Sequence, residues 1–236
     1  DNAGNVENHH FLTEIKLDKT APEGYVTIND GEAFATTTAV LLNISAIDTI
    51  SGVVEMRFSY DNSTYTEWQT YATSKTLTLN GSDGTKTVCG RFRDNAGLVS
   101  PTCSDTIILD TEPPTITIAN PSRDSKVESS TVTVIWAAAD ETSGLSRCEI
   151  RIDQGAWTDI VANTTFTLTR LTDGIHTIDI KATDIAGNTS EQNIRFTVNA
   201  SPRFALGSVE IAVIVVAIVM VVIGIGIYIL KKRKKN

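Results

Sequence analysis

The sequence predicts an all-β fold, in which two tandem β-sandwiches follow the end of a third and precede one transmembrane helix. Stretches of alternating apolar and polar residues recur between residues 40 and 198, a set of motifs recurs after about 90 residues, and a run of 20 uncharged residues stands near the C-terminus. Alternation with a period of two is the pattern of half-buried strands. A helix of roughly 20 apolar residues spans the hydrocarbon core of a bilayer.

Internal repeats divide the chain. Asp94-Asn-Ala-Gly97 recurs as Asp184-Ile-Ala-Gly187, and residues 1–5 (DNAGN) form a third copy. Other residues recur at about the same spacing as this motif: Asp48 as Asp140, Asp83 as Asp173, Trp68 as Trp157, and Leu17-Asp18 as Leu109-Asp110. Since the first residues match only the end of a repeat, we expect these parts: the end of a truncated repeat (1–19), two sandwiches (20–110 and 111–200), a linker (201–210), a transmembrane helix (211–230) and a basic tail (231–236).

Each of the two complete repeats is predicted to be a series of short strands. Apolar and polar residues alternate in six segments: 40–46 and 56–60 in the first repeat, and 132–138, 148–152, 178–182 and 194–198 in the second. Threonine, which favours strands, is abundant, and turn signals separate the segments. Roughly seven short strands with turns every 8–12 residues are typical of a β-sandwich of ordinary domain size.

The second repeat carries the motifs of a known family: Asp140 to Gly144 (DETSG), Asp153 to Trp157 (DQGAW), and a segment, 171–188, that ends in DIAGN. These motifs resemble the Ig-like and fibronectin type III-like repeats of bacterial and archaeal cell-surface proteins. Trp136, on the second strand, fits the fibronectin type III pattern, and the first repeat has Ile44 there. The resemblance implies the sandwich fold. Such repeats occur in adhesins, in S-layer-like proteins and as spacers of secreted hydrolases, so the resemblance does not select one function.

The same resemblance gives His176 a structural role. Sandwiches of this type place a corner tyrosine after this turn, and its side chain bonds back to the backbone across the turn. His176 takes this place in the second repeat and Lys86 in the first. No nucleophile or second ligand recurs beside His176, and the chain has no HExxH, CxxC or Gly-rich phosphate loop. We therefore predict no catalytic residue.

The uncharged run from Ile211 to Leu230 predicts a membrane anchor. Five basic residues follow it directly: Lys231, Lys232, Arg233, Lys234 and Lys235. Because a basic cluster beside a transmembrane helix stays on the cytoplasmic side, we expect a single-pass protein of the cell membrane with extracytoplasmic repeats and a cytoplasmic C-terminus. Before residue 231 the chain has 15 Lys+Arg against 28 Asp+Glu, a net charge of −13, which disfavours nucleic acid as a partner.

Acidic residues gather in the loops at one end of each predicted sandwich. This end holds the start of the first strand, the loop after the second strand and the loop before the last strand. The carboxylates there are Asp18, Asp48 and Asp94 in the first repeat, and Asp110, Asp140 and Asp184 in the second. Converging carboxylates are the ligands that Ca²⁺ takes, but Asp also caps turns. Two interpretations stay open: a Ca²⁺ site in each repeat, or turn caps without any cofactor.

Three cysteines allow one disulfide in an external compartment. Cys89 precedes the Asp-Asn-Ala-Gly loop and Cys103 follows it, so a hairpin would place them opposite each other. Alignment of the repeats puts Cys89 at an outward position and Cys103 at an inward one, and a β-bulge would reconcile the two. We expect a Cys89–Cys103 disulfide. Cys148 alternates with the apolar residues of its strand and is expected to be a buried free thiol.

Asn-X-Ser/Thr sequons are frequent, and an external protein exposes them to glycosylation in a host that modifies such sites. The acceptors that we expect are Asn62, Asn80, Asn163, Asn188 and Asn199. Asn43 also heads a sequon, but it falls inside a predicted strand.

Three functional hypotheses follow. In the first, the repeats form a non-catalytic membrane-anchored stalk that presents an upstream functional region. In the second, they are adhesin modules that bind extracellular protein or glycan through the aromatic residues Tyr60, Tyr65, Trp68 and Tyr71, although Tyr60 and Trp68 recur at positions typical of a core. In the third, the chain is the C-terminal spacer and anchor of an ectoenzyme, such as a protease or glycosidase.

Overall fold

The computed structural model describes residues 17–160 and 164–200, and the regular secondary structure of this part of the chain consists of strands and one short 3₁₀ turn. The first module contains β1 (Glu23–Ile28), a short 3₁₀ turn η1 (Asn29–Gly31), β2 (Phe34–Ala35), β3 (Ala39–Ile47), β4 (Val53–Ser59), β5 (Gln69–Thr70), β6 (Ser74–Thr78), β7 (Gly84–Asp94) and β8 (Cys103–Leu109). The second contains β9 (Thr115–Asn120), β10 (Lys126–Val127), β11 (Val132–Ala139), β12 (Leu145–Ile152), β13 (Thr158–Asp159), β14 (Thr165–Leu168), β15 (Gly174–Asp184) and β16 (Thr189–Val198).

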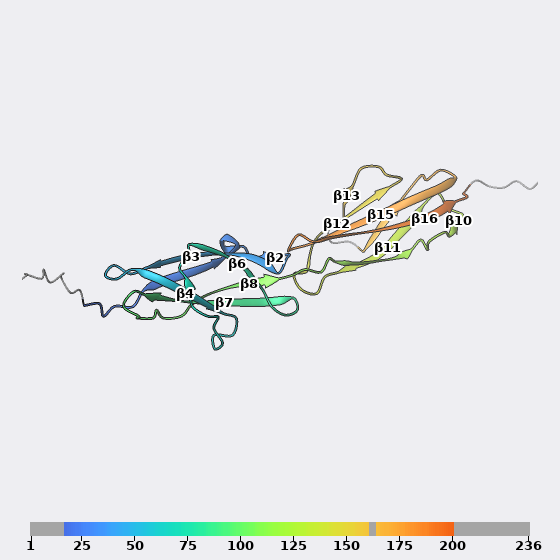
Figure 1. The fold of residues 1–236 in the computed structure, drawn as a ribbon. Coiled ribbons are helices and arrows are strands. Elements are labelled where there is room, and N and C mark those ends of the chain that lie inside the picture. Colours follow the sequence, from blue (N-terminus) through green and yellow to red (C-terminus); the bar gives the residue numbers. More distant parts are fainter. Residues whose placement is uncertain (1–16, 161–163, 201–236) are drawn as a thin grey trace, which may run out of the picture.

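Each module is a sandwich of a three-stranded and a five-stranded sheet. In the first module the strand orders are β1-β3-β6 and β2-β8-β7-β4-β5. In the second they are β9-β11-β14 and β10-β16-β15-β12-β13, which is the same arrangement strand by strand. Figure 1 shows the two modules following one another along the chain. The all-β sandwich fold predicted from the alternating pattern is therefore confirmed for the described residues.

The alternation in the sequence becomes burial in the structure. Val132, Val134 and Trp136 are buried, and the residues between them are exposed. Each module has its own core cluster, with Phe58, Phe92 and Ile107 in the first and Ile178, Ile180 and Phe196 in the second. A strand with one buried face and one exposed face is what period-2 patterning predicts.

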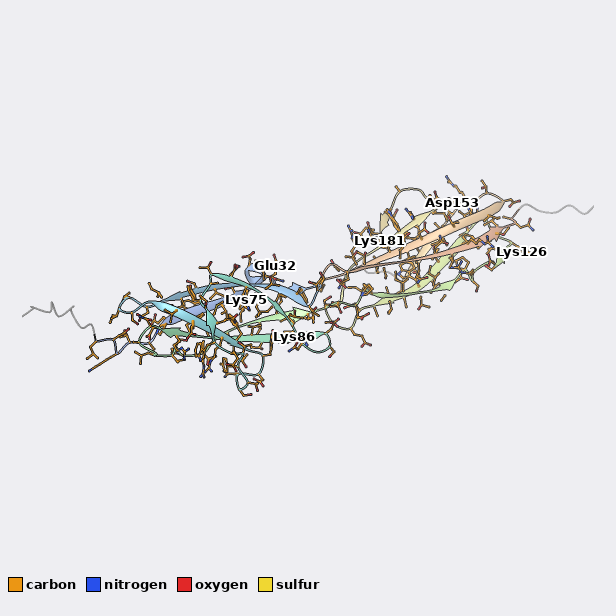
Figure 2. All side chains as sticks on the ribbon, in the orientation of Figure 1. Glu32, Lys75, Lys86, Lys126, Asp153 and Lys181 are labelled. Carbon is orange, nitrogen blue, oxygen red and sulfur yellow. The ribbon has the colours of Figure 1, made fainter. Side chains whose placement is uncertain are left out.

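The exit end of a module is the end at which its last strand finishes. There, in each module, one side chain is hydrogen-bonded to a backbone carbonyl across the turn before β7 or β15. His176 lies near the start of β15, and its Nε2 is 2.8 Å from the carbonyl oxygen of Thr172. Lys86, at the corresponding place in β7, donates from Nζ to the carbonyl oxygen of Ser82. Figure 2 labels Lys86 and Asp153, which lie at the exit ends of the two modules. The structural role predicted for His176 and Lys86 is confirmed.

The predicted anchor, Ile211 to Leu230, its basic tail and the sequon at Asn163 lie outside the described residues. Within the described ranges, no helix has the length and apolar character needed to cross a membrane.

Candidate metal centres

The entry end of a module is the end at which its first strand begins. A cluster of three carboxylates lies at the entry end of each module. Asp18, Asp48 and Asp94 form the first, and Asp110, Asp140 and Asp184 form the second. Within each cluster, one oxygen from each residue lies within 4.8 Å of the others. The structure thus brings together the two sets that the sequence singled out.

The loop aspartates use one carboxylate oxygen to cap their turns. Oδ1 of Asp140 accepts hydrogen bonds from three backbone N–H groups, those of Thr142, Ser143 and Gly144. Oδ1 of Asp48 does the same for Ile50, Ser51 and Gly52. Asp94 caps Ala96 and Leu98, and Asp184 caps Gly187 and Asn188. The turn-cap interpretation therefore describes Oδ1 of every loop aspartate in the two clusters.

Several other carboxylate oxygens of the two clusters have no hydrogen-bond partner among the described residues. Oδ2 of Asp94 and Oδ2 of Asp184 are buried and have no hydrogen-bond partner among the described residues. In Asp110 both carboxylate oxygens are buried and unpartnered, and Oδ2 of Asp18 is in the same condition. Asp94, Asp110 and Asp184 are only 2 %, 0 % and 1 % exposed. A buried carboxylate oxygen without a partner is costly, so these atoms mark a site that can receive a cation.

The second cluster contains a residue of the linker between the modules. Asp110 follows the last strand of the first module, and its backbone N–H donates to the carbonyl oxygen of Ala35 at 2.9 Å. Its carboxylate nevertheless lies with Asp140 and Asp184 of the second module. A cation bound there would connect the two modules through one side chain.

Side chains from both modules also hold the linker. Asp83, in the first module, accepts hydrogen bonds from the backbone N–H of Thr111 at 2.7 Å and from its hydroxyl. Asn188, in the second module, donates from Nδ2 to the carbonyl oxygen of Asp110 at 2.9 Å and to that of Glu112 at 3.5 Å. A cleft of about 580 Å³ beside this linker reaches Asp140.

The sequence analysis did not predict the linker contact of Asn188, because it considered this residue only as the head of a glycosylation sequon. The signal was present, however: the motif ends in Asn188 in the second repeat and in Leu98 in the first. The hydrogen bond between Asp83 and the backbone N–H of Thr111 has a counterpart at the exit end of the second module. There Asp173 accepts a hydrogen bond from the backbone N–H of Ala200 at 2.7 Å.

The outer face of the five-stranded sheet carries a ladder of arginines and aromatic rings in the first module. Arg57 and Arg91 stand directly opposite each other on β4 and β7. Both guanidinium groups contact the ring of Tyr65, at 4.7 and 4.9 Å from its centroid. Arg57 and Arg93 contact the ring of Trp68 at 4.4 and 4.6 Å. Trp68 is thus half-buried over the sheet surface, which corrects its expected position in the core.

The other aromatic residues of the expected cluster are also engaged. Tyr60 is 37 % exposed, so its expected core position is wrong as well, and its hydroxyl donates to the carbonyl oxygen of Thr78 at 2.9 Å. Tyr71 packs edge-on against Phe92, with 6.1 Å between the ring centroids. Repetition alone mislocated Trp68, because a repeated side chain can also lie on the outer face of a sheet.

The expected Cys89–Cys103 disulfide is not formed. Cys89, Cys103 and Cys148 are all free thiols. In the β7–β8 pairing, Cys89 stands opposite Ser104 and Gly90 stands opposite Cys103, without a register shift. The β-bulge that a bridge needed is therefore absent from this hairpin, and the one-residue offset sends the two thiols to opposite faces. Cys148 is buried as expected, and burial raises the pKa of its thiol.

The sequon side chains differ in their freedom to carry a glycan. Asn62 and Asn80 are exposed in loops. Asn188 uses its amide nitrogen to hold the linker carbonyls, and Asn199 is half-buried at the end of β16. Among the described sequons, Asn62 and Asn80 fit modification best, because a glycan replaces an amide hydrogen and needs open space.

Residues 114–180 match the model of the bacterial Ig domain family. This match confirms the resemblance to Ig-like repeats that the motifs indicated. No curated protein matches the sequence. The chain is similar in structure to the fibronectin(III)-like modules of Clostridium thermocellum CbhA, with 18% identity, a TM-score of 0.42, and coverage of 73% of this chain and 93% of that one. It is also similar to the D00-D0 domain of intimin, with 11% identity, a TM-score of 0.41, and coverage of 74% and 100%.

Proposed function

We propose that the chain is a membrane-anchored stalk, in which tandem Ig-like modules hold an upstream functional region away from the cell surface. The observation that carries this proposal is the linker, whose backbone is hydrogen-bonded by Asp83 from the first module and by Asn188 from the second. Modules on a free linker rotate independently. A spacer needs a defined angle between its modules, and these contacts favour one.

The anchor in this proposal is the uncharged run from Ile211 to Leu230, with the basic tail in the cytoplasm and both modules outside. The modules have no catalytic part in it. His176, the single histidine among the described residues, has Nδ1 2.6 Å from Asp153 and Nε2 2.8 Å from a backbone carbonyl, so both nitrogens serve the fold. The same stalk would serve an upstream adhesive domain or an upstream ectoenzyme.

Protease added to intact cells tests the topology. We expect release of fragments from both modules and retention of a small membrane stub that holds the basic tail. Modules that stay protected until the membrane is permeabilised would contradict the proposal.

A second function, adhesion, has one specific observation in its favour. Arg57 and Arg91 are like charges directly opposite on neighbouring strands, and the structure gives neither of them a carboxylate partner within the described residues. Such a pair destabilises a sheet, and local rules are broken most often at functional sites. A carboxylate of an acidic glycan would neutralise the pair, since arginine binds carboxylates in a bidentate manner.

Binding of the detergent-solubilised chain to polygalacturonate, with dextran as the uncharged control, tests the adhesin alternative. Arg91→Gln should weaken binding at least tenfold. Lys181→Gln, the matched change on the same sheet face of the second module, should leave it unchanged. Equal affinity in both variants, or equal binding to dextran, would remove this alternative.

A further inference from the structure

The two carboxylate clusters concentrate negative charge that, within the described residues, only hydrogen bonds from backbone N–H groups and hydroxyls offset. No ion pair within the described ranges involves any of the six aspartates. Oδ2 of Asp94, Oδ2 of Asp184 and both oxygens of Asp110 are buried without a partner. Like charges at this separation repel, and burial strengthens the repulsion. A bound cation would relieve this repulsion in each cluster.

We propose that each cluster binds one Ca²⁺, and that the ion held by Asp110, Asp140 and Asp184 fastens the linker to the second module. Calcium would then set the stiffness of the joint between the modules. This consequence rests on the proposed stalk, whereas ion binding itself does not.

The geometry suits calcium. Ca²⁺ takes 6–8 oxygen ligands at about 2.3–2.6 Å, so two ligands on opposite sides of the ion lie up to about 5 Å apart. The oxygens of each cluster lie within 4.8 Å of one another, which is inside this limit. Mg²⁺ demands shorter bonds and near-ideal octahedral geometry, and it keeps much of its water. The cleft beside the linker reaches Asp140 and gives an ion a route to the second cluster.

Turn capping pre-orients the ligands. With Oδ1 of Asp140 fixed by three backbone N–H groups, its other oxygen has few directions left. Oδ1 of Asp184 is held by the N–H groups of Gly187 and Asn188, and Oδ2 is left without a partner. Because the ligands are held before the ion arrives, binding costs little ordering.

The two sites are not equal. Asp110 has both oxygens free for an ion. Its counterpart Asp18 has Oδ1 engaged by the backbone N–H and the hydroxyl of Thr20, both at 2.9 Å. A carboxylate with two free oxygens can bind Ca²⁺ in a bidentate manner. The second site should therefore have the lower Kd.

Calorimetric titration of the full chain in detergent with CaCl₂ tests this proposal. The wild type should take up two Ca²⁺ per chain, at the Kd of about 10⁻⁴–10⁻³ M that is typical of extracellular modules. Asp140→Asn and Asp48→Asn should each take up one, because an asparagine oxygen can still cap the turn while the charge is lost. Removal of the weaker ion by Asp48→Asn should leave the tighter one.

Asp61→Asn is the matched control, since Asp61 caps a turn through Ser63 and Thr64 and belongs to neither cluster. It should keep both ions. No uptake of Ca²⁺ by the wild type would overturn the proposal. Two ions in Asp140→Asn would overturn the assignment to these residues.

The consequence for the joint has a separate readout. Spin labels on Ser63→Cys in the first module and Glu128→Cys in the second, introduced after the free thiols Cys89, Cys103 and Cys148 are replaced by alanine, report the distribution of distances between the modules. We expect a narrow distribution in Ca²⁺ and a broader one in EDTA, with no narrowing in Asp140→Asn. Ion uptake without any narrowing would reject the role at the joint. A failed protease-release experiment would reject the membrane stalk and leave ion binding intact.

Discussion

The two modules share a strand order but fill their cores with opposite distributions of side chains. Gly24 pairs with Ala46 on β1 and β3, and the corresponding pair of the second module is Ile116 with Ala138. On the facing sheet, Phe92 pairs with Met56, where the second module has Ala182 with Cys148. In each module a large residue on one sheet therefore faces a small one on the other. The large residue comes from the five-stranded sheet in the first module and from the three-stranded sheet in the second.

This exchange shows what the fold requires. The sandwich needs a constant total volume between its sheets, and either sheet can supply it. A Cβ on Gly24 would overlap the ring of Phe92, so glycine is required there only because phenylalanine fills the space. In the second module the small residue is Ala182, and the β9 position is free to carry isoleucine.

The largest effect should come from breaking this exchange in the first module. Phe92→Ala should cost about 3–5 kcal/mol of unfolding free energy. Gly24→Ile should cost about 1–3 kcal/mol by overpacking. The double variant copies the second module and should recover part of both losses. Denaturant unfolding measures the coupling, and the transition of the second module is the internal control. Strict additivity of the two single losses would show that the exchange has no energetic meaning.

The next largest effect should be calcium-dependent stability. At a free Ca²⁺ concentration of about ten times Kd, a site stabilises its folded module by about 1.4 kcal/mol. Differential scanning calorimetry in EDTA and in millimolar Ca²⁺ should show a rise in melting temperature for both modules. Asp140→Asn should abolish the rise in the second module and keep it in the first. Asp48→Asn should give the reverse pattern, and loss of both rises in either variant would contradict independent sites.

The strands and the two carboxylate clusters could be predicted from the sequence for one reason. Period-2 patterning sets which face of a strand is buried, and the repeats place the same aspartate in the same loop twice. The topology of the sandwich then brings those loops to one end. Asp48 and Asp140 could therefore be assigned to a common place before any distance was known.

The disulfide and the arginine ladder could not be predicted in the same way. The register of a hairpin decides which residues face each other, and a shift of one residue changes the face. The shift lies between β4 and β7, at Val53 and Glu55, and not between β7 and β8, where Cys89 and Cys103 stand. The stacking of Tyr65 between two arginines depends on the path of a loop, which no sequence period records.

A smaller effect on stability and on inter-module geometry is expected where the linker enters the second module, because this entry has a side-chain contact that the entry of the first module lacks. Asn188 holds the linker of the second module, and Leu98 stands in the corresponding place of the first. Asn188→Ala should cost about 1 kcal/mol, the usual net value of a lost hydrogen bond, and should broaden the distribution of distances between spin labels on the two modules. Asn80→Ala, a change at an exposed asparagine, should do neither. An unchanged distribution in Asn188→Ala would show that this side chain does not set the angle between the modules.

The smallest expected effect is a pH dependence that only the second module should show. Burial favours the neutral form of His176, but its hydrogen bonds to the carbonyl of Thr172 and to the carboxylate of Asp153 outweigh this, so the pKa of His176 is raised above its usual value of 6.5. The stabilisation that comes from the charged ring is complete below about pH 6.5 and is lost as the pH rises through the folded-state pKa. Lys86 makes the corresponding tie in the first module, and the ordinary pKa of a lysine side chain lies well above that of histidine.

His176→Lys would copy the first module, because a lysine can donate to the same carbonyl and keeps its charge. Unfolding of the wild type between pH 5 and 9 (a range chosen to bracket the ordinary pKa of histidine, about 6.5) should show the second module losing stability relative to the first as the pH rises. In His176→Lys the two modules should follow parallel curves. Parallel curves in the wild type would mean that the single N–H of the neutral ring is enough to hold the turn, and that the turn needs a donor at this position without needing a charge.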